Sequence, residues 1–125
     1  MEFLSFAEVA EVDKALLTSQ DKFLARVALY SLRSLKQITQ ITGQSPEDIT
    51  PQQVMTWVEQ DENVSQQAQG DDTFLLFFTQ LVMSSLQPLK LVAEAEGCAI
   101  ADLEIPQVIT WFEQRAKARM AAQQS

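Results

Sequence analysis

The sequence predicts an all-α protein, a helical bundle of about five helices built from two duplicated helix-turn-helix hairpin units plus an N-terminal helix. Apolar residues recur at the three- and four-residue spacing of amphipathic helices, and we find no convincing strand. Residues 31–60 align without gaps on residues 85–114, an offset of 54, and twelve of the thirty positions are identical. Average composition would give roughly two matches by chance, so the pattern indicates a structural duplication.

The chain is expected to form one domain, because 125 residues are enough for one hydrophobic core. Its predicted parts are an N-terminal helix at 5–18, a first helical unit at 19–60, an acidic Gln-rich loop at 61–72 and a second helical unit at 73–122. The N-terminal helix begins with Ser5 and Glu8, whose spacing has the form of a capping box.

The first unit reads as a long helix, a glycine stop, a short turn and a second helix. Thr18 is a candidate cap for the long helix, and Gly43 supplies its C-terminal stop. Residues 45–48 have the form of a capped single turn. Pro51 follows Thr50, a second capping residue, so the second helix is predicted to begin at Pro51.

The second unit departs from the first in the middle of its long helix. Pro88 stands there, and we expect it to kink the helix or to split it near Gln87. The last helix of this unit continues through the basic residues at 115–119, which suit a helix C-terminus.

The composition argues against an enzyme. The chain has no His and one Cys, Cys98, so it cannot supply a Ser-His or Cys-His nucleophile pair, a His metal ligand or a thiolate zinc site. No phosphate-binding loop, dinucleotide fingerprint or calcium loop is present. We therefore expect no catalytic residue, no cofactor and no metal site.

Charge and targeting signals indicate an acidic cytoplasmic protein. Lys and Arg number 9 against 17 Asp and Glu, a net charge of -8, which disfavours nucleic acid as a partner. The N-terminus is acidic where a secretory signal would be basic, and one Cys gives no sign of an oxidising compartment. Residues 74–92 are apolar but contain several polar side chains, so we expect a buried central helix and no membrane contact.

Four cations fall on one face of the first long helix when it is projected at 100° per residue. They are Lys22, Arg26, Arg33 and Lys36. They are expected either to be an ordinary solvated face, paired with local acids, or to dock an acidic protein partner.

The corresponding face of the second long helix is neutral and partly apolar, with Leu76, Met83 and Leu91. One interpretation is that the N-terminal helix covers this face. The other is that the face pairs with a partner or with a second copy of the chain. Because the two interpretations need the same atoms, they exclude each other.

These observations favour a non-enzymatic interaction module, such as an adaptor, an assembly factor or a regulatory subunit, that forms a homodimer. An alternative is a bundle that binds a small apolar ligand between the two units. The pocket would be lined by Phe74, Phe77, Phe78, Trp57 and Trp111. Nucleic-acid regulation through the four cations and residues 115–119 is the least favoured hypothesis.

Overall fold

The computed structural model describes residues 4–15, 18–62, 64, 66 and 71–124 of the chain. Its α-helices of nine or more residues are α1 (Phe6–Lys14), α2 (Ser19–Thr42), α3 (Pro51–Gln60), α5 (Asp72–Glu96) and α6 (Ile105–Gln124). Two single 3-10 turns, η1 (Pro46–Asp48) and η2 (Ile100–Asp102), precede α3 and α6. Within these residues there is no strand, so the predicted all-α bundle is confirmed.

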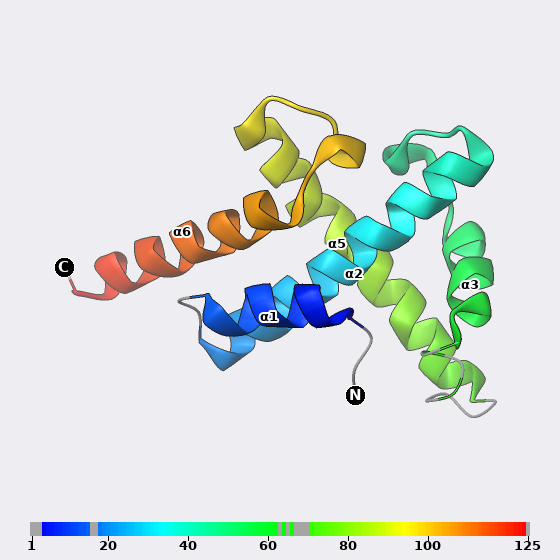
Figure 1. Ribbon diagram of the computed structural model, residues 1–125, viewed down its shortest axis with the longest axis horizontal. Coiled ribbons are helices and arrows are strands. Elements are labelled where there is room, and N and C mark those ends of the chain that lie inside the picture. Colours follow the sequence, from blue (N-terminus) through cyan, green and yellow to red (C-terminus); the bar gives the residue numbers. More distant parts are fainter. Residues whose placement is uncertain (1–3, 16–17, 63, 65, 67–70, 125) are drawn as a thin grey trace.

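The two long helices, α2 and α5, cross near the centre of the molecule (Figure 1). The second helix of each predicted unit packs against the long helix of the other unit, α3 against α5 and α6 against α2. The short helix α1 lies over α2 and α6. The α3 side and the α1–α6 side are thus separate flanks of one crossed helix pair.

The helix boundaries follow from local sequence. At the start of α3, Thr50 and Gln53 form a capping box and Pro51 is the first helical residue, as predicted. The long helices end at Gly43 and Gly97, whose φ angles of 75° and 68° lie in the left-handed region. Only glycine enters that region without strain, so the stop predicted at Gly43 is confirmed and Gly97 ends the second long helix in the same way.

Elements of the same kind recur at the offset of 54 residues. The turns η1 and η2 start at residues 46 and 100, and α3 and α6 start at residues 51 and 105. In the long helices, Ser31 and Ser85 each donate a hydrogen bond to the carbonyl four residues earlier, at 2.7 and 3.0 Å. A duplication as the origin of this correspondence stays a prediction.

Tyr30 is the largest fully buried side chain, with 1% of its surface exposed. Its ring contacts Trp57 and Phe78 edge to face, with centroid distances of 5.8 and 5.4 Å. Its hydroxyl donates to Oδ2 of Asp61 at 3.0 Å. Burial, with the nearby Asp61 carboxylate, raises the pKa of the phenol, so Tyr30 stays neutral and its hydroxyl stays a donor.

Two predictions on the second half of the chain are corrected. The alternative in which Pro88 splits its helix is wrong, since α5 runs without interruption from Asp72 to Glu96. A kink at Pro88 stays a prediction. The carbonyl that loses its partner to Pro88 belongs to Ser84, an exposed residue where water can replace the missing bond. In the predicted loop 61–72, the described residues Glu62, Val64 and Gln66 are helical. Val64 is 1% exposed, so burial of the segment's single large apolar side chain stabilises helix there.

The apolar helix α5 is central to the fold and packs against α2 and α3. By length and composition α5 is also long and apolar enough to cross a membrane. The polar side chains of this segment therefore do not rule out a membrane-spanning helix by this criterion. The core helix of a soluble protein meets the same test. Its buried residues are Leu75, Phe78, Thr79, Val82, Ser85, Leu89, Val92 and Ala93.

Candidate interaction surfaces

The helix α1 lies on the four cations of α2, which we call the cationic stripe (Lys22, Arg26, Arg33 and Lys36). Nη1 of Arg33 is 2.8 Å from Oε1 of Glu8, and Nη2 of Arg26 is 3.0 Å from Oδ1 of Asp13. Lys22 donates to the backbone carbonyl of Asp13 at 3.0 Å. Acids and a carbonyl of α1 thus meet three of the four cations.

The fourth cation, Lys36, also makes a contact within the chain, at the other end of the stripe. Nζ of Lys36 donates to the backbone carbonyl of Leu103, in the segment before α6. Every member of the stripe therefore has a contact inside the chain, as expected for a charged face paired with local groups. Docking of an acidic partner on the stripe stays a prediction, and it would require α1 to leave.

Glu8 is the most buried acid of this contact, with 6% of its surface exposed. Its Oε1 accepts from Arg33 and also from the backbone N–H of Ser5, at 2.8 Å in both cases. The second bond belongs to the capping box of α1, which the structure confirms. One carboxylate oxygen thus stabilises the start of α1 and attaches the helix to α2.

The apolar face of α5 is open. Leu76 and Leu91 are 49% and 38% exposed, and Met83 is partly buried. Because α1 packs against α2 and α6, the interpretation in which the N-terminal helix covers this face is wrong. Phe77, one helical position from Leu76, is 51% exposed. We call Leu76, Phe77, Met83 and Leu91 the α5 strip.

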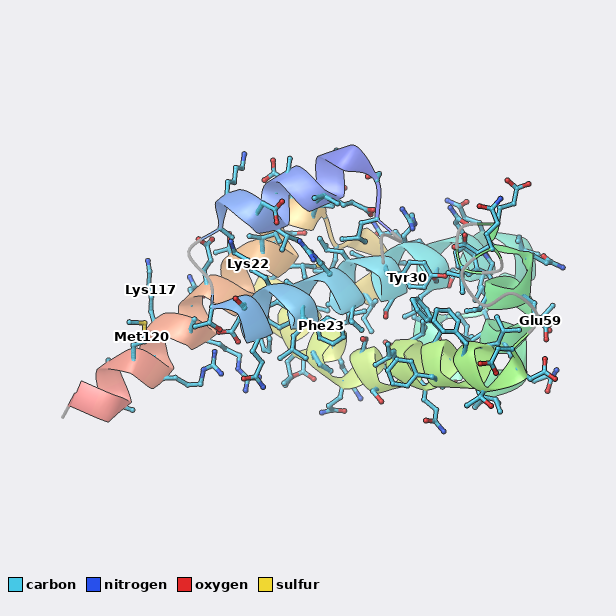
Figure 2. The ribbon with its side chains drawn as sticks, turned by 90° about the horizontal axis from the view of Figure 1, so that it is seen from below. Lys22, Phe23, Tyr30, Glu59, Lys117 and Met120 are labelled. Carbon is cyan, nitrogen blue, oxygen red and sulfur yellow. The ribbon has the colours of Figure 1, made fainter. Side chains whose placement is uncertain are left out.

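Three of the four residues of the α5 strip lie on an uncharged stretch of helix, since residues 73–89 contain no Asp, Glu, Lys or Arg, and the fourth, Leu91, follows Lys90. Two apolar side chains at the start of α2, Phe23 and Leu24, are also 46% and 44% exposed. Figure 2 shows Phe23 on α2, near the start of that helix. The sequence pattern did not indicate Phe23 as a surface residue, because its spacing also fits a core position.

A groove with a volume of about 330 Å³ lies between the end of α2 and α3. Its apolar part is formed by Ile38, Ile41 and Trp57, and its polar part by amides and hydroxyls. Ile41 is 79% exposed, the highest value among the large apolar side chains of the described residues. Sequence reasoning missed this groove, although an isoleucine beside a helix-ending glycine was a possible signal.

The aromatic residues of the ligand-pocket hypothesis are not gathered around one hollow. Phe78 is 1% exposed and packs in the core with Tyr30 and Phe74, whereas Phe77 is 51% exposed. Of the five residues proposed, only Trp57 lines the groove between α2 and α3. An apolar ligand site between the two units therefore has no support in the described part of the chain.

The basic residues near the C-terminus also have internal contacts. The guanidinium of Arg115 lies over the Trp111 ring, 4.8 Å from its centroid. Arg119 donates to Oδ2 of Asp21, an acid only 3% exposed, and this hydrogen bond holds the pKa of Asp21 below its usual value. The pair attaches α6 to the start of α2.

Among the described residues, no group of three or more His, Cys, Asp or Glu side chains could hold a metal ion. Cys98 is partly buried and has no disulfide partner. The surfaces that distinguish this fold are therefore the α5 strip, the groove and the covered cationic stripe. The α5 strip and the groove are exposed, whereas the cationic stripe is engaged by contacts within the chain.

Comparison with known proteins gives a family. No curated protein and no solved structure matches the chain. A family model described as "NDH complex assembly factor CRR9" matches residues 4–119, from the residue before the cap of α1 well into α6. Because this match spans nearly the whole sequence, the chain belongs to the family of NDH complex assembly factor CRR9.

Proposed function

We propose that this protein is a non-enzymatic assembly factor that binds a protein component of the NDH complex through the α5 strip. The description of its family supports the assembly role. The observation that carries the binding surface is the exposure of Leu76, Phe77 and Leu91 on α5, with Leu76 and Phe77 in the part of the helix, residues 73–89, that has no charged residue. A cytoplasmic location, inferred from the sequence, is part of the proposal.

The physical basis is the cost of leaving apolar surface in water. Burying apolar surface contributes about 25 cal/mol per Å², so covering the remaining half of a Leu or Phe side chain contributes on the order of 1 kcal/mol. Leu76, Phe77 and Leu91 together would supply a few kcal/mol, enough to anchor a protein interface. An uncharged face also avoids the desolvation of buried charges.

A second copy of the chain is the other candidate for this face. At a net charge of -8 two copies repel each other, and the uncharged stretch of α5 at 73–89 is where they would meet at the lowest electrostatic cost. Sizing the purified protein by light scattering separates the two cases. If the protein is a monomer, the strip is available to bind a different protein. If the protein is a dimer and Leu76→Asn is a monomer, the strip is the dimer interface.

The test of the function is made in the native cell. Deleting the gene should lower the amount of assembled NDH complex, and the wild-type chain should restore it. The double variant Leu76→Asn with Leu91→Asn should fold but fail to restore the complex. Met120→Asn is the matched control, because Met120 is 57% exposed on α6, outside the strip (Figure 2).

An unchanged level of NDH complex after deletion would overturn the assembly role. Full rescue by the Leu76→Asn and Leu91→Asn double variant would leave the assembly role standing but show that the α5 strip is not needed for it. Circular dichroism of each purified variant establishes that the fold is kept.

A further inference from the structure

We propose that the groove between α2 and α3 binds a basic segment of a partner protein, with an apolar side chain of that segment inserted between Ile41 and Trp57. The inference rests on the proposed function for the existence of a protein partner. It adds a second contact surface and the chemistry of what binds there.

The residues that line the groove indicate which kind of partner side chain would bind there. Ile38, Ile41 and Trp57 form an apolar surface, and the rest of the lining has no charged side chain and consists of Thr42, Gln52, Gln53, Thr56 and Gln60. An apolar side chain therefore enters without leaving a charge unpaired. Amides and hydroxyls both donate and accept hydrogen bonds, so the polar edge suits the peptide groups on either side of the inserted residue.

The acidic residues around the groove indicate which residues of the partner would lie on either side of the inserted side chain. Residues 37–89 contain no Lys and no Arg, and they contain seven of the seventeen acids. The acids are Glu47, Asp48, Glu59, Asp61, Glu62, Asp71 and Asp72. All nine cations lie at residues 14–36 and 90–119, so almost the whole net charge of -8 belongs to the segment that contains α3 and most of the groove.

Figure 2 shows where one of these acids lies relative to the cations of α6. Glu59, on α3, lies at the opposite end from Lys117 on α6 (Figure 2). At the α1 side, the acids Glu8 and Asp13 meet Arg33 and Arg26 within the chain. Arg33 lines a neighbouring hollow with Trp57, Gln60 and Asp61, and its guanidinium pairs with Glu8. Residues 37–89 themselves contain seven acids and no cation, so Lys and Arg of a partner would supply the complementary charge and increase the association rate.

The second unit provides an internal comparison. Thr56, Trp57 and Gln60 have identical counterparts at 110, 111 and 114, but the counterparts of Ile41 and Thr42 are Ala95 and Glu96. The second unit therefore has the tryptophan without the exposed isoleucine beside it. Trp111 can serve as a control for Trp57.

The first experiment uses the two tryptophans as reporters in the full chain. The probe is a short synthetic peptide with a central Leu-Phe pair flanked by Lys and Arg. In a Trp111→Phe variant the peptide should change the fluorescence of Trp57, and in a Trp57→Phe variant the fluorescence of Trp111 should stay constant. No response from Trp57 at saturating peptide would overturn the proposal.

Peptide variants separate the two parts of the recognition. Replacing Leu-Phe by Ser-Ser should weaken binding by about tenfold or more, and replacing Lys and Arg by Glu should abolish it. Equal binding of the Ser-Ser peptide would reduce the interaction to general charge attraction and overturn the insertion. Equal binding of the Glu-flanked peptide would overturn the basic partner.

Protein variants locate the site. Ile41→Asn should weaken binding of the Leu-Phe peptide by about tenfold, whereas Met120→Asn, the matched exposed control, should leave it unchanged. Glu47→Lys with Glu62→Lys should weaken binding more than Glu94→Lys with Glu104→Lys, which gives the same net charge. All four acids are exposed, so these changes test charge position at little cost to the fold.

The two proposals fail in different ways. A chain that restores the NDH complex in the deletion strain but ignores all the peptides would overturn the groove and leave the assembly function standing. A chain that binds the Lys/Arg peptide at Trp57 but is dispensable for the NDH complex would overturn the assembly function and leave the peptide-binding groove.

Discussion

Replacing Glu8 is expected to release α1 from the cationic stripe. The carboxylate is 6% exposed and its Oε1 accepts two hydrogen bonds of 2.8 Å, from Arg33 and from the backbone of Ser5. Glu8→Gln keeps an acceptor for Ser5 but removes the charge that faces Arg33. Glu8→Ala removes both contacts, so the two substitutions separate the cap from the ion pair.

The magnitudes follow from burial. The Arg33 side chain is 31% exposed and that of Glu8 is 8% exposed, so their pair lies between an exposed salt bridge and a buried one. We expect a loss of about 1–2 kcal/mol for Glu8→Gln, between the values typical of the two classes. Loss of the cap adds about 1 kcal/mol, which gives about 2–3 kcal/mol for Glu8→Ala.

Equilibrium urea unfolding followed by circular dichroism measures these losses, and amide hydrogen exchange shows whether α1 loses protection before the core does. A double-mutant cycle with Arg33→Ala isolates the pair, with an expected coupling of about 1–2 kcal/mol. Glu11→Gln is the matched control, because Glu11 forms only an exposed pair with Lys14 in the same helix. Equal losses for Glu11→Gln and Glu8→Gln, or no coupling to Arg33, would refute the reasoning.

Three further predictions concern the rest of the fold. Tyr30→Phe removes the hydroxyl that donates to a carboxylate and should cost about 1–2 kcal/mol in urea unfolding; no loss would mean that this hydrogen bond adds no net stability. Gly43→Ala and Gly97→Ala should each cost about 1 kcal/mol, because alanine is strained at φ of 75° or 68° while its Cβ meets no atom within 4 Å. For Asp21, the hydrogen bond from Arg119 lowers the folded-state pKa, so the stability it contributes is present above about pH 4 and is lost as the pH falls through the folded pKa. Acid unfolding of Asp21→Asn should lack this contribution, and identical acid transitions in the two proteins would count against it.

Helix boundaries were predictable from sequence because they depend on groups close together in the chain. Ser5 with Glu8 and Thr50 with Gln53 form capping boxes three residues apart, and Gly43 ends a helix through its own backbone freedom. The prediction of a loop at 61–72 was partly wrong, because some of its described residues are helical. One of them, Val64, is buried by contacts outside the segment, which the local sequence does not show.

The candidate surfaces were only partly predictable for the same reason. The periodicity grouped Lys22, Arg26, Arg33 and Lys36 on one face, and the structure places contacts from α1 and from the segment before α6 on that face. Periodicity also grouped Leu76 and Leu91 on one face of α5. It did not show whether the N-terminal helix would cover this face or the cationic face of α2, because a short helix could have packed on either. The groove at Ile41 was missed because it is created by α3 packing beside the end of α2.

The sequence by itself determined the helices, their caps and stops, the charge excess and the absence of histidine chemistry. Tertiary structure decided which face α1 covers, and hence that the cations are paired inside the chain while the α5 strip stays exposed. The physical reason is the distance along the chain over which each interaction acts. Caps and stops depend on residues within about one helical turn. In contrast, α1 packs on one of two corresponding faces that lie 54 residues apart in sequence, and it does so through ion pairs and buried contacts that exist only after folding.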